Sequence, residues 1–153
     1  MEHVEKYKYT KKHEVTTAIL VDGGFYRRRA YHFCGAKSPK ERAEELYSYC
    51  IHLLHDKYEH RNLYRIFYYD CPPIENNVFN PISKENVNLG KSDEYKWATE
   101  FFQELKHRRK VALRMGRLSE NTLCYNLKYE SFKKLLNGSM KITDLSDSRE
   151  EEL

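Results

Sequence analysis

The chain has 153 residues, of which 40% are hydrophobic and 33% charged, and these values predict one soluble globular domain. The apolar runs are far shorter than the roughly 20 residues of a membrane span, which argues against a membrane protein. The start at Met1–Lys6 is too polar for a signal peptide, and the cysteines form no C-x-x-C pair, which argues against a disulfide framework. These features favour the cytoplasm. The net charge is +4, but residues outside 144–153 hold 26 basic and 18 acidic side chains, which fits a polyanionic partner, although charge alone favours a solvated lysine-rich surface.

The first predicted element is a strand at Thr17–Val21, which follows a basic, flexible arm over residues 1–14. The strand is apolar on both faces, as is typical of a buried strand in a parallel sheet. Asp22 comes directly after it, and Gly23 with Gly24 allows a tight turn and close approach of a ligand. Ligands of open α/β sheets bind at the carboxyl ends of strands, so Asp22 is a candidate site residue. Its alternative role is to cap the turn that follows.

Two helices are predicted next. The first covers about Phe25–Phe33 and contains the arginine run 27–29. Three consecutive arginines point in three directions on a helix, so one or two of them can face a pocket. The second helix begins at the capping residue Ser38 and is expected to continue to about Tyr58.

The second predicted strand, Asn62–Asp70, is rich in aromatic and β-branched residues and also ends in an aspartate. Pro72 and Pro73 stop it. Residues 74–90 show no sustained period and are expected to form a long loop. Asp70 is therefore a second carboxylate at a strand end, and its alternative role is that of a turn residue.

The remaining predicted elements alternate between helix and strand. Arg114 and Arg117 lie towards the far end of the last strand, and residues 146–153 form an acidic tail. The elements are a helix capped by Ser92 or Asp93 and ending near Lys106, a strand at Val111–Leu118, a short helix at Glu130–Leu136, and a further element that starts near Ile142.

This order of elements predicts an α/β fold in which parallel strands carry helices on both faces. If the first two strands are neighbours, Asp22 and Asp70 emerge side by side. Adjacent carboxylates repel each other unless an arginine or lysine pairs with them, and a divalent cation removes that repulsion. Mg²⁺ typically takes one or two carboxylates, keeps several waters, and can polarise a phosphodiester. Asp22 and Asp70 are thus the predicted catalytic and metal-binding residues.

Several segments resemble one known family. Ile19–Phe25 is similar to the first motif of NYN-domain proteins, a branch of the PIN-like nuclease superfamily. Arg65–Pro73, Asn80–Ser83 and Arg109–Leu118 look like the segments that follow it in the family. The resemblance covers residues 15–145, and it implies a PIN-like three-layer sandwich with a mainly parallel central sheet.

The resemblance also implies an activity, that of a Mg²⁺- or Mn²⁺-dependent ribonuclease. Asp22 and Asp70 match the first two acidic positions of the family. Such proteins continue with a Lys-Gly-Val-Asp segment and a strand ending in Gly-Asp-Ser-Asp, and this chain reaches Leu153 before either. We therefore expect the N-terminal portion of the domain, a sheet with an open edge, and weak metal binding.

Three functions remain open from the sequence. The first is the metal-dependent ribonuclease, the second a non-catalytic RNA-binding or regulatory module, and the third a half-domain completed by another chain or by a homo-oligomer through the open edge. A nucleotide-binding Rossmann domain is disfavoured because neither a G-x-G-x-x-G motif nor a Walker lysine is present. The candidate nucleic-acid contacts are Gly23, Gly24, Arg27, Arg28, Arg114 and Arg117.

Overall fold

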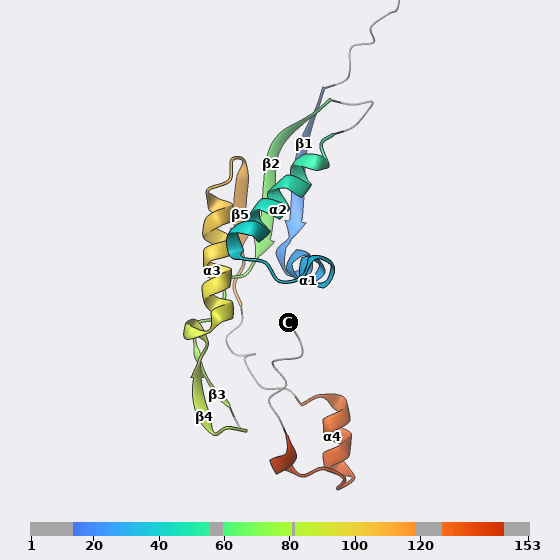
Figure 1. Cartoon of the computed structure of the whole chain (residues 1–153), viewed down its shortest axis with the longest axis vertical. Helices are drawn as coiled ribbons and strands as arrows, with labels where there is room; N and C mark the ends of the chain where they lie inside the picture. Colours follow the sequence, from blue (N-terminus) through green and yellow to red (C-terminus); the bar gives the residue numbers. More distant parts are fainter. Residues whose placement is uncertain (1–13, 56–59, 81, 119–126, 146–153) are drawn as a thin grey trace, which may run out of the picture.

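The fold is α/β and is organised around a parallel sheet of three strands (Figure 1). The strands are β1 (Glu14–Asp22), β2 (His60–Asp70) and β5 (Val111–Met115), in the order β1-β2-β5. The predicted α/β class is confirmed, and the first two strands are neighbours, which is the condition under which Asp22 and Asp70 come to one edge of the sheet. The computed structural model describes residues 14–55, 60–80, 82–118 and 127–145. The N-terminal arm up to residue 13 and the acidic tail lie outside these ranges.

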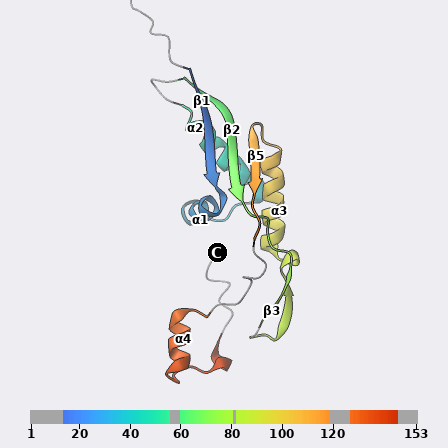
Figure 2. The same ribbon diagram turned by 180° about the vertical axis from the view of Figure 1, so that it is seen from behind.

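The long helices of the core lie on one face of the sheet. In Figures 1 and 2, which show opposite sides, α2 and α3 lie together across the same face, and α1 lies at the end of β1. In the described part of the chain no helix covers the other face, so the expected helices on both faces are not found there. The helices are α1 (Gly23–Cys34), α2 (Pro39–His52), α3 (Asp93–Lys106) and α4 (Tyr129–Leu136). Among these residues, no helix combines the length and the apolar character needed to cross a membrane.

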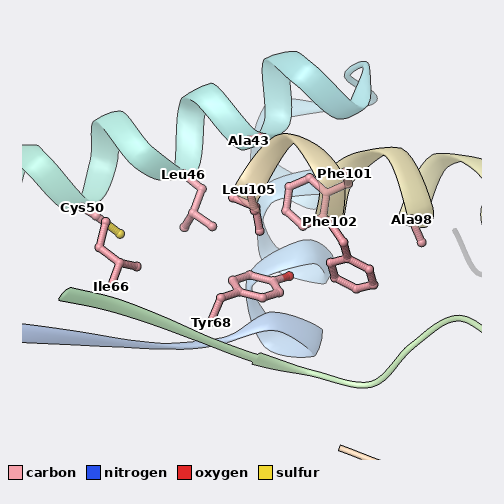
Figure 3. Close-up of a cluster of buried hydrophobic side chains, with 9 residues drawn as sticks. All are labelled: Ala43, Leu46, Cys50, Ile66, Tyr68, Ala98, Phe101, Phe102 and Leu105. Atoms are coloured by element: carbon pink, nitrogen blue, oxygen red, sulfur yellow. The ribbon is translucent and has the colours of Figure 1, made fainter. Parts of the chain in front are cut away.

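The core lies between β2 and the helices α2 and α3 (Figure 3). Tyr68 is fully buried, and its ring meets Phe101 and Phe102 edge-on at centroid distances of 5.7 and 6.2 Å. Ile66 lies two residues earlier on the same side of the strand and is also buried. The buried cluster consists of Ala43, Leu46, Cys50, Ile66, Tyr68, Ala98, Phe101, Phe102 and Leu105.

Strand alternation leaves the opposite face of the sheet exposed. Tyr69 is 45% exposed and Leu20 on β1 is 67% exposed, and Tyr64, at the register shift between β1 and β2, is 58% exposed. Leu20 lies opposite Phe67 in the register of the sheet. A run that is apolar on both faces therefore does not imply burial on both faces within the described chain.

Several boundaries differ from those predicted, among them the ends of α2 and β5. α2 begins with the predicted capping box, in which the side chains of Ser38 and Glu41 each accept from the other's backbone N–H. It ends at His52 rather than near Tyr58, because β2 starts at His60 beside Glu14 and the chain must turn before that residue. β5 ends at Met115 rather than Leu118, so the strand does not include Arg117.

The segment predicted as a long loop contains a β-hairpin. Strands β3 (Asn77–Asn80) and β4 (Glu85–Asn88) pair antiparallel, with Val78 opposite Val87. Each strand has four residues, too few for the alternation of apolar side chains to stand out in the sequence. A 3₁₀ turn, η1 (Leu89–Lys91), then leads into α3.

Candidate functional site

The carboxyl ends of the parallel strands bring the two predicted aspartates to one edge of the sheet. Asp22 ends β1 and lies opposite Tyr69, which precedes Asp70 at the end of β2. Tyr69 in turn lies opposite Arg114 on β5. Asp22, Tyr69 and Arg114 thus form one lateral row across the sheet, with Asp70 one residue beyond it.

Asp22 caps helix α1, which is the role that the sequence analysis gave as the alternative to metal binding. Its Oδ1 accepts a hydrogen bond from the backbone N–H of Phe25 at 3.0 Å, which satisfies an unpaired donor at the start of α1. The residue is exposed, and within the described chain no group bonds to its Oδ2. Capping therefore uses one oxygen and leaves the other facing solvent.

Asp70 is bound on both oxygens. Its side chain is only 8% exposed, and the Nη2 of Arg27 lies 3.0 Å from Oδ1 and 3.0 Å from Oδ2. The backbone N–H of Cys71 donates to Oδ1 at 2.8 Å, and the hydroxyl of Tyr68 donates to Oδ2 at 3.2 Å. Charge-assisted contacts of this kind hold a carboxylate firmly in one orientation.

Tyr68 is a site residue that the sequence analysis did not identify. Burial raises the pKa of its phenol well above the ordinary value, and the neighbouring Asp70 carboxylate raises that pKa further. The hydroxyl therefore keeps its proton at neutral pH and donates to Asp70. Tyr68 lies two positions before Asp70 on the same strand, and residues at that spacing lie on the same face of a sheet, so the sequence pattern could have identified it.

Of the two glycines after Asp22, Gly23 lies close to Asp70 and Tyr68 of the protein itself rather than open to a ligand. It is buried, and a Cβ at this position would lie 2.4 Å from Oδ2 of Asp70 and 2.6 Å from the hydroxyl of Tyr68. A Cβ at Gly24 would meet its nearest neighbour, Oδ1 of Asp22, at an ordinary 3.7 Å. The first turn of α1 can lie directly against Asp70 only because Gly23 has no side chain.

The candidate arginines fall into different environments. Arg27 is bound to Asp70, and its Nε is buried without a hydrogen-bond partner. Arg28 is exposed on α1, and Arg117 is exposed after β5. The guanidinium of Arg114 lies 5.2 Å from the ring centroid of Phe67 on the uncovered face. The structure thus pairs Arg27 with an acid and leaves the other three candidates exposed.

The donors at this edge do not fit a two-carboxylate metal site in the arrangement described. A cation at Asp70 would have to displace Arg27, which already neutralises that carboxylate. Within the described residues no group of three or more His, Cys, Asp or Glu side chains is placed to hold a metal ion. Asp22 is the one carboxylate of the pair that is open to a cation.

Comparison of the chain with protein-family models, with curated proteins and with solved structures gives no match.

Proposed function

We propose that this chain is an NYN/PIN-like domain that binds single-stranded RNA at the carboxyl edge of its sheet. The observation that carries the proposal is the pairing of an exposed aromatic ring, Tyr69, with an exposed arginine, Arg114, on a face that no described helix covers. Aromatic rings stack on bases with little sequence preference. Arginines bind phosphates through a planar fork of donors.

The surroundings of this pair support the same function. The guanidinium of Arg114 lies 5.2 Å from the ring centroid of Phe67, and this cation–π contact holds its charge on the uncovered face. Arg28 and Arg117 are exposed and supply further positive charge for a phosphate backbone. The basic excess of the chain outside residues 144–153 adds a general attraction for a polyanion.

Binding to a labelled single-stranded oligouridine is expected to weaken steeply as salt rises, because bound phosphates release counterions. The change Tyr69→Ala should weaken binding by roughly 5- to 100-fold, the usual loss of one stacked base. Arg114→Met is expected to weaken it by about tenfold and to reduce the salt dependence. Fluorescence anisotropy at several salt concentrations measures both effects.

Two matched variants serve as controls for this experiment. Tyr129→Ala removes an exposed tyrosine on α4, and Arg109→Met removes an exposed arginine just before β5, at the opposite end of that strand. Both should bind as the unchanged protein does, apart from a small uniform effect of charge. Equal losses in the control and site variants would show that RNA does not bind at this edge.

A second candidate function is metal-dependent ribonuclease activity. The observation that favours it is the placement of Asp22 and Asp70 at the ends of neighbouring parallel strands, where the NYN resemblance has its first two acidic positions. Asp22 already has an oxygen free of protein donors. For Asp70 to contribute, Arg27 must first release it.

The change Asp22→Asn is expected to abolish Mn²⁺-dependent cleavage of RNA while leaving the fold intact. Asparagine is as good a helix cap as aspartate, so α1 keeps its first hydrogen bond. Asp144→Asn, an exposed change on η3 (Ile142–Asp144), is the control. Cleavage that persists unchanged in Asp22→Asn shows that the assigned site is wrong. If the unchanged protein binds RNA but does not cleave it, RNA binding is the one function of the two that remains.

A further inference from the structure

The outer edge of β1 is the second feature of the molecule that points to a partner. β1 is an edge strand, because β2 pairs with it on one side and no described strand pairs with it on the other. A groove of about 570 Å³ follows this free edge between α1 and α2. Its walls include Ile19 and Val21 from β1, Ala30 and Phe33 from α1, and Leu46 and Tyr49 from α2.

Large apolar side chains are exposed around this groove. Leu20, Phe25 and Phe33 are 67%, 65% and 66% exposed, and Tyr49 on α2 is 59% exposed. All four line the groove. Contiguous apolar exposure of this kind marks an interaction site, in contrast to apolar residues scattered singly over a surface.

The edge lacks most of the features that normally prevent strand pairing, and its one irregularity is the register shift at Thr17/Ala18, where the extra residue is Tyr64 of β2. Residues 16–21 read Thr-Thr-Ala-Ile-Leu-Val and contain no charge, proline or glycine. Edge strands that must stay single are usually interrupted by lysine, proline or a bulge. An uncharged, β-branched run of six residues is instead typical of segments that pair with copies of themselves.

We propose that β1 pairs antiparallel with β1 of a second copy of this chain around a two-fold axis, which joins the two three-stranded sheets into one continuous sheet. A strand added here places its inward side chains over the groove, where Phe33 and Tyr49 of the first copy cover them. The symmetry buries both grooves at once. The interface is independent of the RNA-binding proposal.

The charges at the two ends of β1 select the register. Residues directly opposite each other in an antiparallel pair face the same side of the sheet. If the axis passes through Ala18, Glu14 of one copy lies opposite Asp22 of the other, and like charges at such positions are destabilising. If it passes through Ile19, Asp22 lies opposite Thr16 and every other pair between them is uncharged. The Ile19 register is therefore favoured.

Antiparallel pairing also determines what happens to the functional edge. The carboxyl ends of the two β1 strands point in opposite directions, so the Asp22 of each copy remains at its own end of the joined sheet. Each copy therefore keeps a complete row of Asp22, Tyr69 and Arg114. RNA binding and self-association can consequently be measured and lost separately.

Sedimentation velocity over a wide range of protein concentration tests the proposal. The mass is expected to rise from the monomer value of 18.4 kDa towards twice that value as concentration increases. The double change Leu20→Lys/Phe33→Lys should weaken association by at least about tenfold, because it places charge at an edge that must be desolvated. Phe79→Lys, a change at a 56% exposed residue of β3, should leave association unchanged.

Amide hydrogen exchange of the unchanged protein provides a readout that needs no variant. The amides of residues 16–21 should exchange more slowly as protein concentration rises, while those of β5 should not change. A monomer at every concentration overturns the proposal, as does a dimer that survives the double change. A monomer whose edge becomes protected only when another polypeptide or RNA is added likewise overturns it and identifies a different occupant.

Discussion

Replacing Gly23 with alanine is expected to destabilise the domain by about 3 kcal/mol. The added methyl group would lie 2.4 Å from Oδ2 of Asp70 and 2.6 Å from both the hydroxyl and Cζ of Tyr68. Neither neighbour can move freely, since Asp70 is held by Arg27 and Tyr68 is fully buried against Phe101. The strain must therefore be relieved by shifting α1 away from the sheet. Urea unfolding followed by circular dichroism measures the loss.

Gly24→Ala is the matched control for this change. The two glycines are adjacent in the first turn of α1, but a Cβ at Gly24 meets only Oδ1 of Asp22 at 3.7 Å. Alanine also favours the helix over glycine by up to about 1 kcal/mol. Gly24→Ala should thus be neutral or stabilising. Equal losses in the two variants would contradict the packing of Gly23 against Asp70.

The part of the site that follows from strand order could be predicted from the sequence. Asp22 and Asp70 each come directly after an apolar run, and parallel strands that are neighbours must bring such residues to the same edge. The capping role of Asp22 could also be considered from the sequence, but the predicted helix starts at about Phe25, and α1 begins two residues earlier at Gly23. These inferences need only the periodicity of the chain and the handedness of its connections.

The pairing of Arg27 with Asp70 could not be predicted, because it depends on the rotational phase of α1. The run 27–29 offers three directions, and the sequence does not say which one faces the sheet. In the structure that phase is set by Gly23, which packs against Asp70. Arg27 lies four residues later on the same side of the helix, and the buried Ala30 continues that side. Arg28 and Arg29 are thereby turned towards solvent.

The uncovered face of the sheet could not be predicted from the sequence for a related reason. Leu20 and Phe67 are as apolar as the core residues beside them, so the pattern of β1 and β2 predicts burial on both sides. Whether a face is covered depends on which side each crossover helix takes. Here α2 and α3 take the same side, as Figures 1 and 2 show. The apolar pattern is consistent with a sheet whose second face and outer edge receive partners.

Removing the guanidinium of Arg27 is expected to cost about 2–3 kcal/mol of stability, the second large effect at this site. Arg27→Met keeps much of the apolar stem but leaves the carboxylate of Asp70 largely buried without its cation. Arg28→Met removes the same charge from the neighbouring exposed position and should change stability by less than about 0.5 kcal/mol. Urea unfolding at pH 7 compares the two variants.

A second change at Asp70 separates the ion pair from packing. Asparagine can still accept from the N–H of Cys71 and the hydroxyl of Tyr68, but it carries no charge. Arg27→Met/Asp70→Asn should therefore recover about 1–2 kcal/mol of the loss in Arg27→Met, and Asp70→Asn alone completes the cycle from which the coupling energy of the pair is obtained. Additive losses would show that Arg27 stabilises the domain through its stem alone.

The same variants test whether the ion pair between Arg27 and Asp70 prevents a metal ion from binding to Asp70. In the unchanged protein Arg27 holds the oxygens of Asp70, so Mn²⁺ should raise the melting temperature little. In Arg27→Met the carboxylate of Asp70 becomes available to a cation, and Mn²⁺ is expected to raise the melting temperature as a ligand of the folded state does. Arg27→Met/Asp70→Asn should lose that response. Because the arginine and the cation compete for the same oxygens, a metal response that is equal in all three proteins would place the metal elsewhere.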